Sequence, residues 1–183
     1  KKELYLKDDE ALDEHLLKLG VENSILTPSK GDPIEGEHLK NLSRKVLRYR
    51  SVLQKINRRR DARIVDALLR HTELDVDLLR PQSMIGEVSR IDVAGIEEKV
   101  VQPLLRHFEA HNPEILNGLK WDIVSSSSHP KVNFETRELG SLRRTTIDGA
   151  FIAGSDYSAL QDHYSHFQDL AGPYSVTFGD KEP

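Results

Sequence analysis

The side chains best suited to a chemical role are the basic residues between positions 40 and 63. That stretch holds ten lysines and arginines and a single acid, Asp61. Seven of the ten are arginines, whose planar guanidinium can bind a phosphate through two parallel hydrogen bonds. Such contacts neutralise phosphates and are blind to base sequence. The candidate residues for contact with nucleic acid are Arg44, Lys45, Arg48, Lys55, Arg58, Arg59 and Arg63.

This basic segment is an exception in an acidic chain. The formal net charge of the 183 residues is −4, although the segment itself carries +9. Like charges one helical turn apart repel, so ordinary helix faces mix the two signs. The segment is therefore interpreted as a surface for an anion, either nucleic acid or an acidic protein surface. A solvated helix face, or an acidic patch elsewhere in the same chain, are the alternatives.

One long helix has to carry most of these charges, from about Glu37 to Asn57. Its apolar residues recur at alternating spacings of three and four, as in a coiled-coil seam. They are Leu39, Leu42, Val46, Tyr49, Leu53 and Ile56. At about 100° per residue the basic side chains lie on the side away from this seam. The residues on that side are Lys40, Arg44, Arg48, Lys55 and Arg58.

Further helices are predicted on both sides of this one. Three leucines with helical spacing, Leu12, Leu16 and Leu19, indicate a short helix at the start. Asp61 is the expected N-cap of a helix that buries Ile64, Val65, Leu68 and Leu69. A helix from about Asp92 to His111 contains Pro103, which we expect to kink or split it. Residues 21–36 and 81–90 are interpreted as loop and linker.

The later part of the chain changes to the period of a β-strand. Alternation predicts strands at 119–123 and 132–136, a third at 143–148, and a return strand at "YSVTF". A last helix should open at Gly154–Ser155 and end at Pro173. The predicted class is α+β: a long coiled-coil-like helix and further helices packed with a small antiparallel sheet. We expect one domain over 1–183, mainly helical over 1–90, with helix, antiparallel strands and a final helix over 91–183.

Other residue pairs could in principle bind a metal, and we favour a plainer interpretation of each. Asp9 and Asp13 lie one turn apart, as do His107 and His111, and His163 and His166 lie three apart. Two ligands are fewer than a zinc or magnesium site needs, and acids suit the first turn of a helix. Phosphate loops and nucleophile elbows are missing from the sequence, and cysteine does not occur. We therefore predict that this chain has no catalytic residues, metal or cofactor.

Several stretches of the sequence resemble a known family. They are "YLKDDEALDE", "GEHLKNL", "YRSVLQKINRR", "LKWDIV", "GAFIAGSDYSAL" and "VTFGDKEP". Together they resemble the large insertion that Gram-negative-type DNA gyrase B chains carry inside their toprim domain. The resemblance implies a parent enzyme that is a type IIA topoisomerase, which uses ATP and Mg²⁺ to supercoil DNA negatively together with the gyrase A subunit. The family's ATP-binding domain, toprim acids and "RGK" segment have no match here.

The resemblance implies a role without catalysis for this chain. Within the gyrase B subunit it would brace toprim and neighbouring domains, and it would engage double-stranded DNA through the basic helix. The alternative is a purely structural spacer without direct contact to DNA. Apolar runs are too short for a membrane span, the charged start resembles no signal peptide, and both ends look cut from a longer chain. We expect a cytoplasmic protein.

Overall fold

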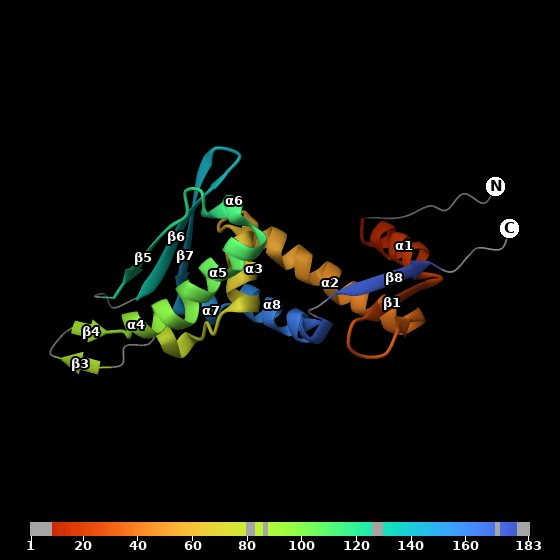
Figure 1. Cartoon of the computed structure of the whole chain (residues 1–183), viewed down its shortest axis with the longest axis horizontal. Coiled ribbons are helices and arrows are strands. Elements are labelled where there is room, and N and C mark those ends of the chain that lie inside the picture. The colour runs from red at the N-terminus through yellow and green to blue at the C-terminus, as the bar shows by residue number, and fades with distance from the viewer. Residues whose placement is uncertain (1–8, 80–82, 86–87, 126–129, 171–172, 179–183) are drawn as a thin grey trace. The chain divides into compact units, whose positions relative to one another are not determined.

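A computed structural model describes residues 9–79, 83–85, 88–125, 130–170 and 173–178 (Figure 1). These described residues form two compact units: unit 1 takes those up to residue 49 and from 162 onward, and unit 2 takes those between 50 and 161. The boundaries fall inside two helices, α2 (Gly36–Asn57) and α8 (Ser155–Ser165). Helices and small antiparallel sheets confirm the α+β class, and α2 confirms the long helix. The single domain over 1–183 stays a prediction.

Unit 1 contains a three-stranded antiparallel sheet in the order β2-β1-β8, with α1 (Asp9–Val21) beside it (Figure 1). Its strands are β1 (Ser24–Pro28), β2 (Ile34–Glu35) and β8 (Tyr174–Phe178). The loop predicted for 21–36 is therefore wrong, whereas the return strand is confirmed. The prolines and glycines of 21–36 favour a loop, so local sequence did not indicate strand β1. The main partner of β1 is β8, about 150 residues later, and Leu26 pairs with Val176.

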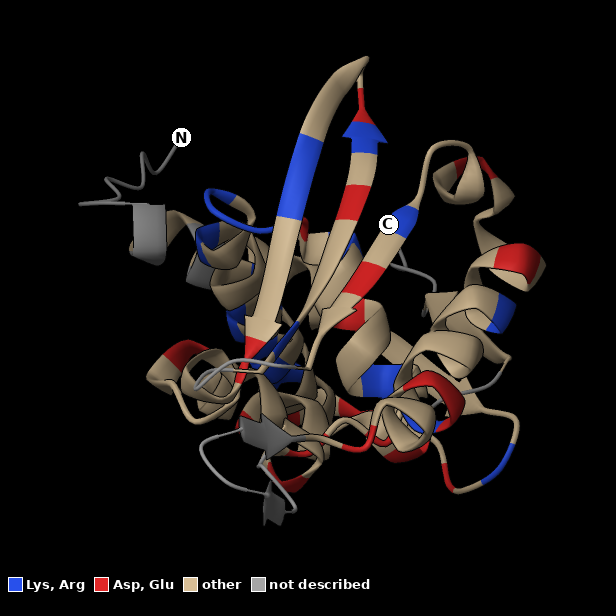
Figure 2. Cartoon of the chain, turned by 90° about the vertical axis from the view of Figure 1, so that its left-hand side faces the viewer, with Lys and Arg blue, Asp and Glu red and all other residues tan. Residues whose placement is uncertain are grey.

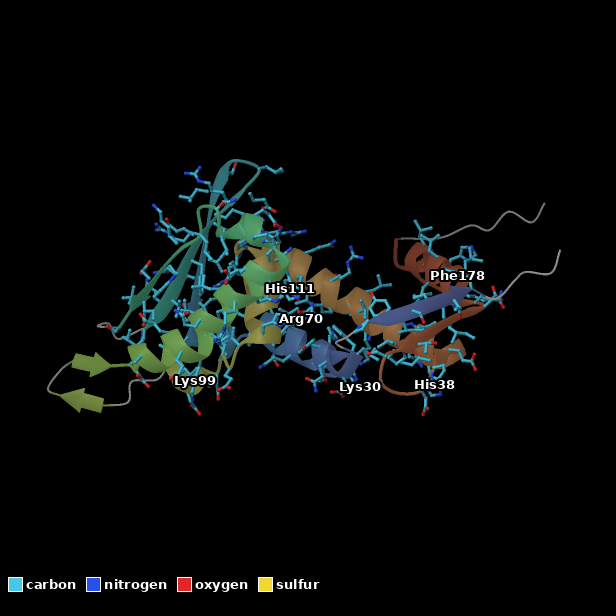
Figure 3. The ribbon with its side chains drawn as sticks, viewed as in Figure 1. Lys30, His38, Arg70, Lys99, His111 and Phe178 are labelled. Atoms are coloured by element: carbon cyan, nitrogen blue, oxygen red, sulfur yellow. The ribbon has the colours of Figure 1, made fainter. Side chains whose placement is uncertain are left out.

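Unit 1 leaves many apolar side chains in water. Leu12, Leu16 and Leu19 of α1 form the predicted stripe, yet they are 40%, 54% and 52% exposed. On β8, Phe178 is 72% exposed (Figure 3). Leu39 and Tyr49 are buried in this unit, and the Tyr49 and Phe167 rings meet edge to face with centroids 5.3 Å apart. Unit 1 thus has a small core and an apolar surface.

Unit 2 packs helices against the sheet β5-β6-β7 and has the larger core. Its strands are β5 (Lys120–Val124), β6 (Lys131–Glu138) and β7 (Ser141–Asp148), which confirms the three predicted strands. Alternate residues of β6, namely Val132, Phe134 and Thr136, are buried on one face. The helices near that core are α3 (Ala62–His71), α5 (Gln102–His111), α6 (Pro113–Leu116) and α7 (Gly149–Ile152).

Pro103 lies in a continuous helical run whose hydrogen bonds change around it. The run consists of α4 (Val93–Ile96), a π-helical segment (Glu97–Val101) and α5, which confirms the helix over 92–111. Proline lacks the N–H that would bond to the carbonyl four residues earlier, at Lys99. The Lys99 carbonyl accepts from Glu73 N at 3.1 Å instead. The wider π turn, with Gln102 N bonded to Glu97 O, fits the proline without breaking the helix.

Two other boundaries differ from the sequence-based expectation. The expected linker at 81–90 contains the paired strands β3 (Ser83–Ile85) and β4 (Val88–Arg90). Helix α8 ends at Ser165, before a short 3₁₀ turn (Gln168–Leu170), so Pro173 does not end it. A second 3₁₀ turn (Val76–Leu79) follows α3.

Among the described residues, each helix is too short or too polar to cross a membrane.

Candidate nucleic-acid interface

The turn after α2, residues 58–61, is fastened to strand β7 by one arginine. The Arg143 guanidinium donates to the backbone carbonyl oxygens of Asn57 and Arg60, the latter at 3.0 Å. It also forms an ion pair with Glu138, at 2.6 Å. The last carbonyls of a helix have no partner inside the helix, so this guanidinium caps α2. The turn therefore has a fixed place on the sheet.

Asp61, at the end of this turn, is the centre of a buried hydrogen-bond network. Its residue is 0% exposed, and its Oδ1 accepts from Arg63 N at 3.0 Å, which caps α3 as predicted. The Arg63 guanidinium donates to both carboxylate oxygens, from Nε to Oδ1 at 3.0 Å and from Nη2 to Oδ2 at 2.6 Å. Thr136 Oγ1 donates to Oδ2 at 2.6 Å, and Asp61 N donates to Thr145 Oγ1 at 2.8 Å. These bonds join the turn to β6 and β7.

The network holds Asp61 ionised although it is buried. Burial opposes the charge, but the hydrogen bonds from Arg63 and Thr136 and the positive charge of Arg63 outweigh it and lower the pKa of Asp61. The hydrogen bond between Arg63 and Asp61 also raises the pKa of Arg63.

Arg60 is also turned inward: its Nε donates to Thr146 O at 2.9 Å, and its guanidinium lies 4.1 Å from the Phe151 ring centroid. Arg60 and Arg63 thus stabilise the turn itself.

Arg58 and Arg59 lie on the surface of the same turn. Both are exposed, and within the described part of the chain no ion pair or hydrogen bond involves either guanidinium. They line a cavity of about 510 Å³ together with Arg143, Arg144 and Glu138. We call this surface, defined by those four arginines and Glu138, the arginine groove. Figure 2 shows the same mixture of signs on the sheet, with basic bands on neighbouring strands and acidic segments between them.

The sheet arginines are less available than Arg58 and Arg59. Arg144 is exposed and pairs with Glu135 across the strands, Nη2 to Oε1, at 2.5 Å. A pair in water contributes little stability, so an anion of higher charge can compete with Glu135 for Arg144. Arg143 is held by two carbonyls and Glu138 and has a structural role. Within the described residues, Arg58 and Arg59 of the groove are unpaired, whereas Arg144 has a partner that an anion can replace and Arg143 has a structural role.

The remaining predicted residues are distributed over both units. In unit 1, Arg44 donates to Asn41 Oδ1 at 2.8 Å, Lys45 Nζ lies 3.1 Å from His166 Nε2, and Arg48 is exposed. In unit 2, Lys55 pairs with Asp156 at 2.7 Å. Of the predicted set, the structure thus brings Arg58 and Arg59 together, beside Arg143 and Arg144, which were not predicted. Whether any of the predicted set binds DNA stays a prediction.

Sequence reasoning missed the contribution of β7 to this surface. The signal was present, because a two-residue turn at Leu139–Gly140 sets the register of the hairpin. That register places Arg143 opposite Thr136 and Arg144 opposite Glu135. What the sequence did not indicate is that the hairpin packs beside residues 57–59, about 80 positions earlier.

Three of the eight histidines lie together at the other end of α3. The His107 ring stacks on His71 with centroids 3.8 Å apart and on His111 at 4.8 Å. Burial, and then the charges of neighbouring histidines and Arg70, lower the pKa of His71 and of His107. Among the described residues no three histidine or acidic side chains converge as metal ligands would. The side chains of Asp9 and Asp13 lie outside the described part.

Comparison with known proteins identifies relatives of this chain. A family model described as "DNA gyrase B subunit insert domain" matches residues 24–182. The DNA gyrase B subunit of Myxococcus xanthus is 45% identical over 87 residues, which is 47% of this chain. That match covers 10% of the relative, so the chain corresponds to a small part of a much longer protein.

Proposed function

The chain belongs to the DNA gyrase B subunit insert domain family, and we propose that it serves a gyrase B protein as a non-catalytic module that engages DNA by its phosphates. The observation that carries this proposal is the arginine groove. Arg58 and Arg59 are exposed and unpaired in the described structure, on a turn that a buried network fixes in place. Because the turn is held before any ligand arrives, little ordering entropy opposes binding.

The charge balance of the groove favours a polyanion over a single carboxylate. Four arginines face one glutamate, Glu138, and that acid is already paired with Arg143. Arginine forks match the geometry of phosphate oxygens, and successive phosphates of a duplex present charges along a line. Double-stranded DNA therefore fits this surface better than an isolated anion does. Binding of this type is insensitive to base sequence.

The activity of the whole enzyme belongs to the proposed parent. In that parent, ATP and Mg²⁺ would drive negative supercoiling of DNA together with the gyrase A subunit, in the cytoplasm. We propose that other parts of the gyrase B subunit bind both cofactors, because the family's ATP-binding domain and toprim acids have no match in this sequence. This chain would contribute to DNA engagement and to the support of toprim.

A salt series of duplex binding tests the proposal. The chain is compared with the double variant Arg58→Glu, Arg59→Glu. We expect affinity to fall at every salt concentration and the slope of log K against log salt to become shallower by about two, one for each lost phosphate contact. Duplexes of unrelated sequence should give the same result.

A second double variant of equal charge change serves as the control. Lys18→Glu, Lys30→Glu alters two exposed lysines of unit 1 that lie outside the arginine groove. It should keep the native slope. Binding no tighter than millimolar at low salt, or equal losses in the two variants, would show that the groove does not bind DNA.

A second function, bracing of protein domains, is supported by the apolar surface of unit 1. Large exposed apolar side chains, such as Leu16 and Phe178, mark protein contact surfaces when they gather. We propose that toprim or a neighbouring domain covers them in the parent. Leu16→Asp with Phe178→Asp should then lower the melting temperature of the full-length parent more than that of this chain alone. Equal shifts would contradict the bracing role.

A further inference from the structure

The tip of the β6–β7 hairpin holds an apolar side chain in an unfavourable position. The register pairs Glu138 with Ser141, so Leu139 and Gly140 form a two-residue turn. Their φ angles are 48° and 82°, which is the left-handed region required at both positions of a type I′ turn. Glycine and asparagine suit this region, whereas a leucine there is strained.

The same leucine is also fully exposed. Leu139 is 103% exposed, and Leu142 beside it is 60% exposed. Both views of unit 2 show the hairpin tip standing clear of the helices (Figures 1 and 2). Leu139 thus combines backbone strain with apolar surface in water, and full exposure means that no contact inside the described structure offsets either cost. Strain of this kind, when observed, points to a role outside the fold.

The hairpin is anchored close to its tip, and positive charge lies there. Arg143 ties β7 to the carbonyls of Asn57 and Arg60. Leu139 and Leu142 line the same cavity as Arg58 and Arg59. An apolar tip therefore adjoins the arginine groove. A protein partner would match the leucine but would need to supply acids for the arginines, whereas a DNA duplex supplies phosphates on both sides of an apolar stack of bases.

We propose that Leu139 inserts between neighbouring base pairs of a duplex and bends it, while the arginine groove holds the flanking phosphates. The proposal rests on the proposed function, since it requires DNA at the groove. Apolar side chains that enter a base step from the minor groove unstack it and kink the duplex by about 20–90°. The strained turn fixes the direction of the side chain, so insertion does not require the hairpin to become ordered first.

The test uses the full-length protein that carries this chain and two duplex probes. One probe contains 2-aminopurine, whose fluorescence rises when its stack is opened, and the other carries a dye pair at its ends to report bending. The informative variant is Leu139→Asn, because asparagine tolerates the left-handed region and the variant should melt no lower than the native protein. We expect it to bind with the native salt slope and to lose both the fluorescence rise and the bend.

Two further variants complete the comparison. Leu139→Met keeps an apolar tip and should keep both signals. Leu47→Asn alters an exposed leucine of α2 and should also leave both signals unchanged. Tight binding by the native protein without unstacking or bending, or equal signals from Leu139→Asn, would overturn the insertion while leaving the proposed function intact. Absence of duplex binding would overturn both, and a Leu139-dependent change of molecular mass in light scattering would show that the tip contacts protein instead.

Discussion

At the N-terminal end of α3 a buried carboxylate is surrounded by donors, whereas at the C-terminal end three histidine rings lie against one another. Asp61 accepts hydrogen bonds from Arg63 and Thr136. His107, by contrast, stacks between His71 and His111. Figure 3 shows the second region, where Arg70 and His111 lie on neighbouring helices. The pKa of the central groups is lowered in both regions.

The same direction of shift has opposite meanings at the two ends. A lowered pKa means that Asp61 keeps its charge in the fold, but that His71 and His107 resist gaining one. The first end is a site built around a charge, and it holds the turn that carries Arg58 and Arg59. The second end is a stack of rings in which His71 and His107 oppose a positive charge. The difference indicates which end of α3 is organised for electrostatic recognition.

The largest test of this comparison is Asp61→Ala. The change removes the N-cap of α3, leaves Thr136 without its acceptor and leaves Arg63 unpaired. Loss of one partner of a buried pair typically costs 3–5 kcal/mol, and we expect about 3 kcal/mol because Arg63 keeps some access to water. Urea denaturation measures the free energy of unfolding.

Asp66→Ala is the matched control for this change. Asp66 belongs to the same helix and pairs with Arg70 at 3.4 Å, but in a partly exposed position. Its loss should cost about 0.3–0.5 kcal/mol. If the two alanine variants are equally stable, Asp61 is not the centre of a buried network.

A smaller effect is expected from Thr136→Val, which keeps the shape and removes one donor to Asp61. We expect a loss of about 1–2 kcal/mol, because the buried carboxylate keeps Arg63 and the backbone N–H but loses one hydrogen bond. Thr146→Val is the control, since Thr146 Oγ1 bonds to Asn133 on the partly exposed face of the sheet. Equal losses in the two valine variants would mean that Thr136 contributes only an ordinary surface contact.

The charge on Asp61 also has a signature in pH. Its pKa in the fold lies below the ordinary value of 3.8, so the folded state holds the charge more firmly than the unfolded chain does. The stabilisation is complete above that ordinary value and is lost as pH falls through the lowered pKa. The difference in unfolding free energy between the native chain and Asp61→Asn should shrink over that window. A constant difference would contradict the assignment.

The contrast between the two ends of α3 was only half visible in the sequence. Asp61 as N-cap and the buried Ile64 and Leu68 follow from local rules, because capping and helical periodicity act within a few residues. Thr136 and Arg143 reach the turn from strands about 75–85 residues away, and no local pattern encodes such a contact. The stacking of His71 on His107 has the same origin, since two helices distant in the chain meet there.

The smallest expected effect is the response of the histidine end to mild acid. Because the pKa of His71 and His107 in the fold lies below the ordinary 6.5, the unfolded chain takes up protons first as pH falls. Stability is therefore unaffected above that value, decreases below it, and levels off once pH has passed below the lowered pKa. His107→Gln should flatten this step, and so should Arg70→Gln, because the Arg70 charge helps to lower both pKa values. Neither change should alter the loss of stability at lower pH that protonation of Asp61 causes, because Asp61 lies at the opposite end of the helix. If the stability of the native chain stays constant between neutral pH and the pH range in which Asp61 titrates, His71 and His107 carry no penalty for protonation. The two ends of α3 would then not differ in the way their geometry indicates.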